Sequence, residues 1–257
     1  MKVALLQTHI YWRQKAANIE VCANLMAGLP ADCRLIVLPE MFATGFSMEQ
    51  VAELAETNEG HTIQWMCDTA RTKNTALCGS VIISENNRFF NRLFFVLPDG
   101  SFQHYDKRHL FAMGGENAVF SAGNKRLTVS YEGWRICPLV CYDLRFPVWS
   151  RNYHNDFDLL IYVANWPQVR VSVWNTLLLA RAIENQSYVV GVNRVGDDGL
   201  GVAHNGQSKF INFKGELMQQ ANDAEAVVLA DLSLPDLRQF RSRFPVWRDA
   251  DNFSILL

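Results

Sequence analysis

LVCYDLRFP, residues 139–147, runs from an apolar strand directly into a charged turn and places Cys141 at the junction. Cysteine is among the residue types most often buried, and packing is its usual role. Here Tyr142 and Asp143 follow at once and Arg145 comes soon after, so we expect the strand to end and the thiol to face a polar crevice. A free thiol is mostly protonated near pH 7 and needs a base or a nearby cation to act as a nucleophile. The stretch therefore predicts a strand that ends at a candidate nucleophile.

A candidate base lies far upstream, in LIVLPEMF, residues 35–42. The apolar run before Glu40 is continuous, as in a strand that is covered on both faces. A carboxylate at the carboxyl end of a buried strand is costly unless it is paired or takes part in chemistry, and ligands of α/β sheets bind at that end. A glutamate that caps a turn or pairs with a surface lysine fits the same pattern, so the structural alternative stays open.

A candidate cation lies in YDKRHLF, residues 105–111, where Lys107 follows a strand and a polar stretch. By itself this lysine reads as a solvated surface residue, like its neighbours Arg108 and His109. In combination, a base at Glu40 and a cation at Lys107 would supply what a nucleophilic thiol requires.

Short β-rich runs alternate with helical ones along the chain, which indicates a layered α/β domain. Apolar residues recur at helical spacing over residues 14–29, 60–73 and 173–185. Runs between turn residues predict strands at 3–7, 35–40, 76–83, on both sides of the turn at 98–100, and at 126–134, 135–141, 159–165, 188–193, 208–213 and 226–232. This number of strands is high for one open sheet, so we expect two packed sheets with helices outside them. No linker or repeat divides the chain, and we expect a single domain over residues 1–257.

Pro138 lies in the apolar run just before the candidate nucleophile. A proline has no N–H to donate to a strand ladder and sits badly in a central strand. We therefore expect a strand edge or a bulge at this position.

The composition argues against several classes of partner. The net charge is −2 and no block of basic residues stands out, so nothing favours nucleic acid or an anionic membrane. The six cysteines form no CxxC pair and a chain of this length needs no disulfide framework, so we expect free thiols in a reducing cytosol. No apolar window reaches the length of a membrane span, and residues 1–12 read as a first strand rather than a signal peptide. A cytoplasmic location is expected.

The three stretches together resemble the signatures of the nitrilase superfamily of carbon–nitrogen hydrolases, in the same order and at similar separations. The likeness extends over nearly the whole chain, to FPVWRDAD near the carboxyl terminus. Further stretches resemble the bacterial ω-amidase branch, which hydrolyses the terminal amide of 2-oxoglutaramate and 2-oxosuccinamate. They are PEMFATGFSM (39–48), CYDLRFPVW (141–149), ANWPQVR (164–170) and ARAIENQSYVVGVNR (180–194).

The resemblance implies a fold, an assembly and a set of catalytic roles. The fold would be a four-layer αββα sandwich, and two subunits would form a homodimer in which sheets continue across the interface. Glu40 would be the general base, Lys107 the cation at the oxyanion and Cys141 the nucleophile. Glu116, in GGENAVFSAG (114–123), matches a second glutamate that holds the lysine or the leaving group. A small-molecule amide would be the substrate, with no metal and no organic cofactor.

Several further residues are candidates for binding the substrate. The backbone N–H of Tyr142 would stabilise the oxyanion, and Arg145 would bind a substrate carboxylate through its planar fork. An ion pair between Arg145 and Asp143, or between Arg145 and another acid, is the alternative. Aromatic and methionine side chains would line the pocket, although a residue of this kind taken singly is more often part of the core: Phe46, Phe111, Met113 and Trp166.

Three other readings remain open. Within the superfamily, the chain could be an N-carbamoyl amidase or a nitrilase on the same scaffold. It could also be a non-catalytic relative that serves as a binding subunit, although all three catalytic positions are present. A thiol redox protein using Cys137 and Cys141 is less favoured, because the spacing is CxxxC with an intervening proline.

Overall fold

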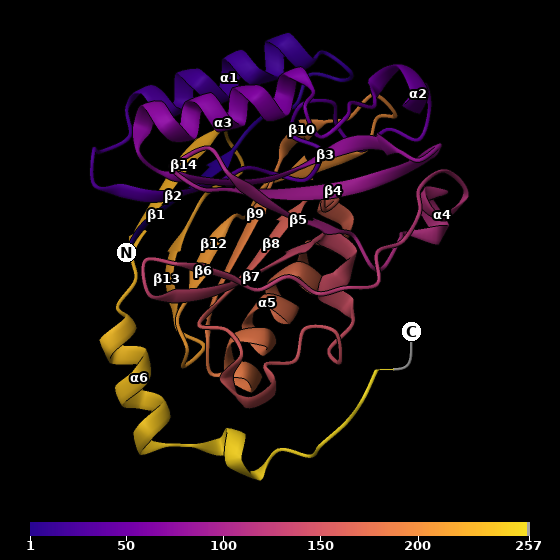
Figure 1. Cartoon of the computed structure of the whole chain (residues 1–257). Coiled ribbons are helices and arrows are strands. Elements are labelled where there is room, and N and C mark those ends of the chain that lie inside the picture. Colours follow the sequence, from indigo (N-terminus) through magenta and orange to yellow (C-terminus); the bar gives the residue numbers. More distant parts are fainter. Residues whose placement is uncertain (256–257) are drawn as a thin grey trace.

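Two six-stranded sheets form the centre of the computed structural model, which describes residues 1–255 (Figure 1). The first sheet has the order β14-β1-β2-β3-β4-β5 and contains β1 (Lys2–Gln7), β2 (Cys33–Val37), β3 (Ala76–Glu85), β4 (Arg88–Val96), β5 (Phe102–Asp106) and β14 (Ala226–Asp231). The second has the order β13-β12-β9-β8-β7-β6 and contains β6 (Val129–Tyr131), β7 (Trp134–Val140), β8 (Leu159–Ala164), β9 (Tyr188–Asn193), β12 (Lys209–Ile211) and β13 (Leu217–Gln220). A separate two-stranded ribbon consists of β10 (Val195–Asp197) and β11 (Ala203–Asn205).

The helices are α1 (Lys15–Ala27), α2 (Val51–Leu54), α3 (His61–Lys73), α4 (Glu116–Val119), α5 (Val171–Asn185) and α6 (Leu234–Arg243), and short 3₁₀ turns lie at Ala112–Gly114, Cys141–Arg145, Tyr153–Asn155, Gln168–Arg170 and Val246–Asp249. The three predicted helices, now α1, α3 and α5, are confirmed, and none of their ends shifts by more than two residues. Both α3 and α5 end where a residue adopts the left-handed backbone, Asn74 and Gln186, and returns its N–H to carbonyls of the last turn. None of the helices within residues 1–255 is both long enough and apolar enough to cross a membrane.

Side-chain alternation along the strands explains the layers. Successive side chains of a strand point to opposite faces. Val3 and Leu5 of β1 belong to the core that also contains the second sheet, whereas Ala4 and Leu6 pack with residues of α1 and α3. On the far face of the second sheet, α5 packs against β9 through Trp174 and its neighbours (Figure 1). The predicted four-layer αββα sandwich is confirmed.

The structure of the segment before Cys141 differs from one predicted strand and shows how Pro138 fits into a strand. The prediction of a single strand over 126–134 is wrong, because Glu132 and Gly133 turn with φ of +48° and +78° and Trp134 already begins β7. The ladder of β6 stops beside Ile136, whereas β7 continues to pair with β8 through Pro138 without a shift in register. Pro138 therefore lies where β7 is an edge on one side, and the position holds no bulge.

Candidate active site

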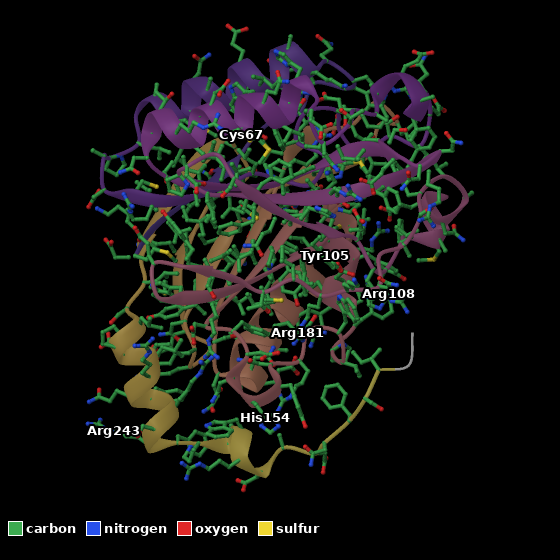
Figure 2. All side chains as sticks on the ribbon, in the orientation of Figure 1. Cys67, Tyr105, Arg108, His154, Arg181 and Arg243 are labelled. Atoms are coloured by element: carbon green, nitrogen blue, oxygen red, sulfur yellow. The ribbon has the colours of Figure 1, made fainter. Side chains whose placement is uncertain are left out.

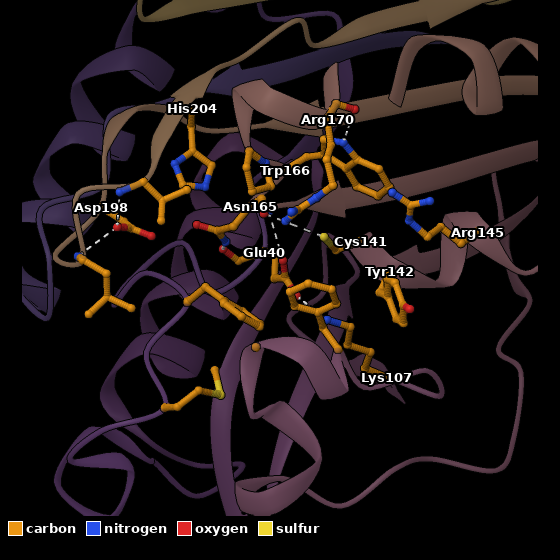
Figure 3. Close-up of a pocket in the computed structure, with 17 residues that line it drawn as sticks. Glu40, Lys107, Cys141, Tyr142, Arg145, Asn165, Trp166, Arg170, Asp198 and His204 are labelled. Atoms are coloured by element: carbon orange, nitrogen blue, oxygen red, sulfur yellow. Dashed lines mark hydrogen bonds and ion pairs between the residues drawn. The ribbon is translucent and has the colours of Figure 1, made fainter. Parts of the chain in front are cut away.

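Four segment ends meet at one pocket. Glu40 lies in the turn three residues beyond β2, Lys107 directly follows β5, Cys141 directly follows β7, and Asn165 directly follows β8. All four line the same cavity (Figure 3). Because the carboxyl ends of strands in an α/β sheet share one edge, residues distant in sequence converge there.

The Glu40 carboxylate is buried and accepts hydrogen bonds on both oxygens. Its Oε1 accepts from Nζ of Lys107 at 2.8 Å and from Nδ2 of Asn91 at 2.8 Å. Its Oε2 accepts from the backbone N–H of Asn165 at 2.9 Å. A buried charge needs such partners, and here they also fix the orientation of the carboxylate. The alternative of a turn cap or a surface ion pair is wrong, because the lysine partner is itself buried.

Lys107 lies between two carboxylates rather than in solvent. Its side chain is 1% exposed, and its Nζ lies 2.8 Å from Glu40 and 2.9 and 3.0 Å from the two oxygens of Glu116. Burial lowers the pKa of Lys107, but the carboxylates of Glu116 and Glu40 outweigh burial, so its pKa lies above the ordinary value. The expectation of a solvated lysine is wrong, and the side chain is an ammonium ion at neutral pH.

Glu116 is the first residue of α4 and lies beside Lys107 without lining the pocket. Its Oε2 also accepts the backbone N–H of Phe111 at 2.6 Å, and Asn91 links it to Glu40 through Nδ2 at 3.1 Å. Burial raises the pKa of Glu116, and the nearby Lys107 opposes the rise. Of the two expected roles, this position fits holding the lysine and not the leaving group.

Cys141 opens its 3₁₀ turn in a left-handed backbone, with φ of +44°. A non-glycine residue in this region is strained, and such residues cluster at active sites. Its Sγ lies 3.9 Å from the carbonyl oxygen of Asn165, and it is the one cysteine of the six that is partly accessible. Burial raises the pKa of the Cys141 thiol well above its ordinary value; the Glu40 carboxylate adds to the rise and Lys107 opposes it. The direction of this shift favours the protonated thiol.

Cys137 is separated from this chemistry. It lies in β7 with no exposed surface, it is a free thiol, and burial raises its pKa to about 12. A redox pair needs a second reactive sulfur that is partly exposed, so the geometry gives no support to the thiol redox reading.

Asp143 connects the turn that contains Cys141 to the loop that contains Lys107. Its Oδ2 accepts from the backbone N–H of Val140 at 3.0 Å and from the hydroxyl of Tyr105 at 2.8 Å. Its Oδ1 accepts from the backbone N–H of His109 at 3.1 Å and lies 2.8 Å from Nδ1 of the same residue. Tyr105, labelled in Figure 2, belongs to the core between the sheets. Since four groups already surround this carboxylate, the alternative of an ion pair with Arg145 is wrong.

The pocket is small and its surface is largely apolar. Its cavity measures about 180 Å³, below the roughly 300–1,000 Å³ typical of sites for drug-sized ligands. Met113 is 82% exposed and does not line it, so that expectation is wrong; the 3₁₀ turn at 112–114 turns its side chain outward. The other three predicted wall residues do line it: Phe46, Phe111 and Trp166. Tyr142 and Arg145, predicted to bind the substrate, line it as well.

Comparison with known proteins places the chain in a family. The family described as carbon–nitrogen hydrolase matches residues 2–242. The chain belongs to the carbon–nitrogen hydrolases. Omega-amidase YafV of Escherichia coli (strain K12) is 46% identical over 256 residues, which cover 99% of this chain and 98% of that protein. The 2-oxoglutaramate amidase of Bacillus subtilis (strain 168) is 28% identical over 250 residues, 96% of each chain.

A solved structure agrees closely with this hydrolase. XC1258 from Xanthomonas campestris, described as a CN-hydrolase superfamily protein with an arsenic adduct in the active site, has a TM-score of 0.97 and 42% identity. The match covers 99% of this chain and 98% of that one. The protein is therefore an enzyme of the nitrilase superfamily that hydrolyses carbon–nitrogen bonds of amides, and the predictions of family, fold class and enzyme class are confirmed.

The hydrolase pocket also contains residues that the sequence reading missed: Asn165, Arg170 and His204. Asn165 is the first residue after a buried strand, the same signal that drew attention to Cys141, and could have been found in that way. His204 comes from the β10–β11 ribbon. No local pattern marks it, because the ribbon belongs to neither large sheet and reaches the pocket only through folding.

Proposed function

We propose that this hydrolase cleaves the terminal amide of small 2-oxo-acid amides, such as 2-oxoglutaramate and 2-oxosuccinamate, to the acid and ammonia. The observation that carries the proposal is the single pocket lined by Cys141, Glu40 and Lys107. The relatives named omega-amidase and 2-oxoglutaramate amidase support the choice of substrate. A cavity of about 180 Å³ suits a substrate of few carbon atoms.

The first half of the reaction forms a thioester. Glu40 takes the thiol proton as the sulfur of Cys141 attacks the amide carbon, and the carbonyl oxygen becomes negative. Lys107 and the backbone N–H of Tyr142 stabilise that oxyanion; a fixed donor aimed at developing charge is typically worth a factor of about 10²–10³. Glu40 then gives its proton to the nitrogen, the carbon–nitrogen bond breaks, and ammonia leaves.

The second half of the reaction restores the enzyme. A water molecule gives a proton to Glu40 while its oxygen attacks the thioester carbon, and the same oxyanion site is used again. The carbon–sulfur bond breaks, the acid leaves, and the sulfur of Cys141 recovers its proton from Glu40. One residue thus serves as base and acid in both halves, which suits a carboxylate held by three donors. Glu116 keeps Lys107 in position and exchanges no proton.

The remaining pocket residues bind the rest of the substrate. Arg145 receives the substrate carboxylate; its Cζ lies 5.3 Å from the centroid of the Trp166 ring, an arrangement that steadies a guanidinium group. Phe46 and Tyr142 form walls against the short carbon chain. The proposed steps use groups of this chain and water, so the proposal includes no metal and no organic cofactor.

We further propose that the chain is one catalytic domain, that it works in the cytoplasm, and that it forms a homodimer. The shared core between the sheets supports a single domain. Leu179 and Ile183 on α5 are 39% and 53% exposed, and apolar side chains of this kind are suited to an interface. Light scattering of the purified protein measures the number of subunits, and a monomer would contradict the homodimer.

Ammonia release from a panel of substrates tests the function. The panel contains 2-oxoglutaramate, an N-carbamoyl amino acid and a nitrile, each also incubated with Cys141→Ala and with Cys137→Ala as a matched control. We expect 2-oxoglutaramate to be the best substrate, Cys141→Ala to be inactive and Cys137→Ala to be active. Preference for the carbamoyl compound or the nitrile would favour those rival activities, and an active Cys141→Ala enzyme would sink the thioester mechanism.

A further inference from the structure

Arg170 lines the pocket, but the mechanism above gives it no role. It ends the 3₁₀ turn after β8 and shares the cavity with Arg145. Within residues 1–255, neither guanidinium group has an ion pair or a side-chain hydrogen bond; each lies over an aromatic ring instead. Two arginines with unused donors beside a small cavity can bind an anionic ligand.

A single indole links the two arginines. Nε1 of Trp166 donates to the carbonyl oxygen of Arg170 at 2.8 Å, and the other arginine lies over the indole ring. The Cζ of Arg170 lies 5.3 Å from the ring centroid of Phe111, on the wall of the same cavity. Figure 3 shows Arg145, Arg170 and Trp166 along one side of the pocket, with Cys141 nearby.

Two acidic residues line the pocket, and only one of them has partners on both carboxylate oxygens. Glu40 accepts from Lys107 and two further donors. Oδ1 of Asp198 accepts the backbone N–H groups of Leu200 and Val202. Figure 3 shows Asp198 on the opposite side of the pocket from Arg145, so among the described pocket residues the side that carries the two arginines offers donors and positive charge.

We propose that Arg170, together with Arg145, makes the pocket select amides with a neutral acceptor next to their carboxylate and reject those with an ammonium group there. The inference rests on the proposed function and names the residue that sets its specificity. A 2-oxo-acid amide presents a carboxylate and a keto oxygen, both acceptors, to two groups that only donate. Glutamine presents the same amide and carboxylate, but its ammonium group would lie beside two guanidinium groups of like charge.

Steady-state kinetics on three amides of equal chain length test the proposal: 2-oxoglutaramate, glutamine and pentanamide, which lacks the carboxylate. The variants are Arg170→Gln, Arg170→Lys and the control Arg88→Gln, which removes an arginine that also lies 5.3 Å from an aromatic ring but outside the pocket. In Arg170→Gln we expect kcat/KM for 2-oxoglutaramate to fall about tenfold or more, mainly through KM, since a hydrogen bond to a charged group is lost. Pentanamide should change less than twofold, and Arg170→Lys should lie between wild type and Arg170→Gln. The control should match wild type.

The decisive readout for the role of Arg170 is the ratio of kcat/KM for 2-oxoglutaramate to kcat/KM for glutamine. A fall of about tenfold in Arg170→Gln, with an unchanged melting temperature, supports the proposal. An unchanged ratio, or an equal loss on all three amides, overturns it, because Arg170 would then only support Trp166. Wild-type enzyme that prefers glutamine, or that releases ammonia from neither acid, would overturn the proposed function as well.

Discussion

Replacing Asp143 with Asn should weaken the contacts between the turn that contains Cys141 and the loop that contains Lys107. Oδ2 of Asp143 accepts from the backbone N–H of Val140 and from the hydroxyl of Tyr105. Oδ1 accepts from the backbone N–H of His109 and also lies beside Nδ1 of that residue. An amide group must turn its NH₂ toward one side, so whichever orientation it adopts leaves a buried backbone donor without an acceptor. A buried unpaired donor costs about 1–3 kcal/mol, and the second group on that side is also disturbed.

The expected loss of stability is therefore about 3 kcal/mol, or roughly 6–12 °C in melting temperature for a chain of this size. Because the same contacts fix the strained backbone of Cys141, we also expect kcat to fall by a factor of about 10², as small displacements of reacting groups can cause. Thermal unfolding and ammonia release measure the two effects.

Asp99→Asn is the matched control. Asp99 is exposed, and both of its bonds to Ser101 are accepted by a single oxygen, which an amide retains. We expect this variant to lie within about 0.5 kcal/mol of wild type. If Asp143→Asn were as stable and as active as Asp99→Asn, the reasoning from donor positions would be refuted.

Four other perturbations follow from the same geometry. Lys107→Met leaves two buried carboxylates without their cation and should lower the free energy of unfolding by about 3–5 kcal/mol at neutral pH. A variant that unfolds at the same denaturant concentration as wild type would contradict this. Burial raises the pKa of Cys137 to about 12, so above pH 9 only the unfolded state releases this proton, and the free energy of unfolding falls as the pH rises. In Cys137→Ala this fall should be shallower by up to about 1.4 kcal/mol per pH unit. Parallel profiles of unfolding free energy against pH for the variant and wild type would refute this prediction. Arg145→Lys should raise KM for 2-oxoglutaramate about tenfold more than for a neutral amide, and an equal rise would remove the carboxylate contact. A Cβ at Gly123 would lie 2.1 Å from the carbonyl oxygen of Asp106, so Gly123→Ala should cost about 1–3 kcal/mol and lower kcat by displacing the lysine loop; unchanged kinetics and stability would contradict this.

The candidate nucleophile and base were visible in the sequence because strand ends are local features. An apolar run that stops at a polar residue shows where a buried strand reaches the edge of a sheet, and both Cys141 and Glu40 follow such runs. The boundaries were less certain. The turn at Glu132 and Gly133 was read as part of a strand, because a short hairpin and a continuous strand have the same apolar alternation.

The burial of Lys107 could not be predicted from its neighbours in the sequence. Its sequence neighbours made it look like a surface residue, and its burial depends on carboxylates that lie 67 and 9 residues away. The network around Asp143 was equally hidden, because its partners come from two segments that meet only when the sheets pack together.

The sequence by itself determined the strand and helix pattern, the family signatures and the candidates for the nucleophile and the base, because hydrophobic periodicity and residue chemistry are properties of short segments. Tertiary structure alone decided that Lys107 is a buried ammonium ion and that Cys141 lies in a strained turn. It also decided that Arg145 and Arg170 face the pocket with no ion pair among the described residues. Those features depend on which distant groups share a volume from which water is excluded, and packing of the two sheets sets that arrangement.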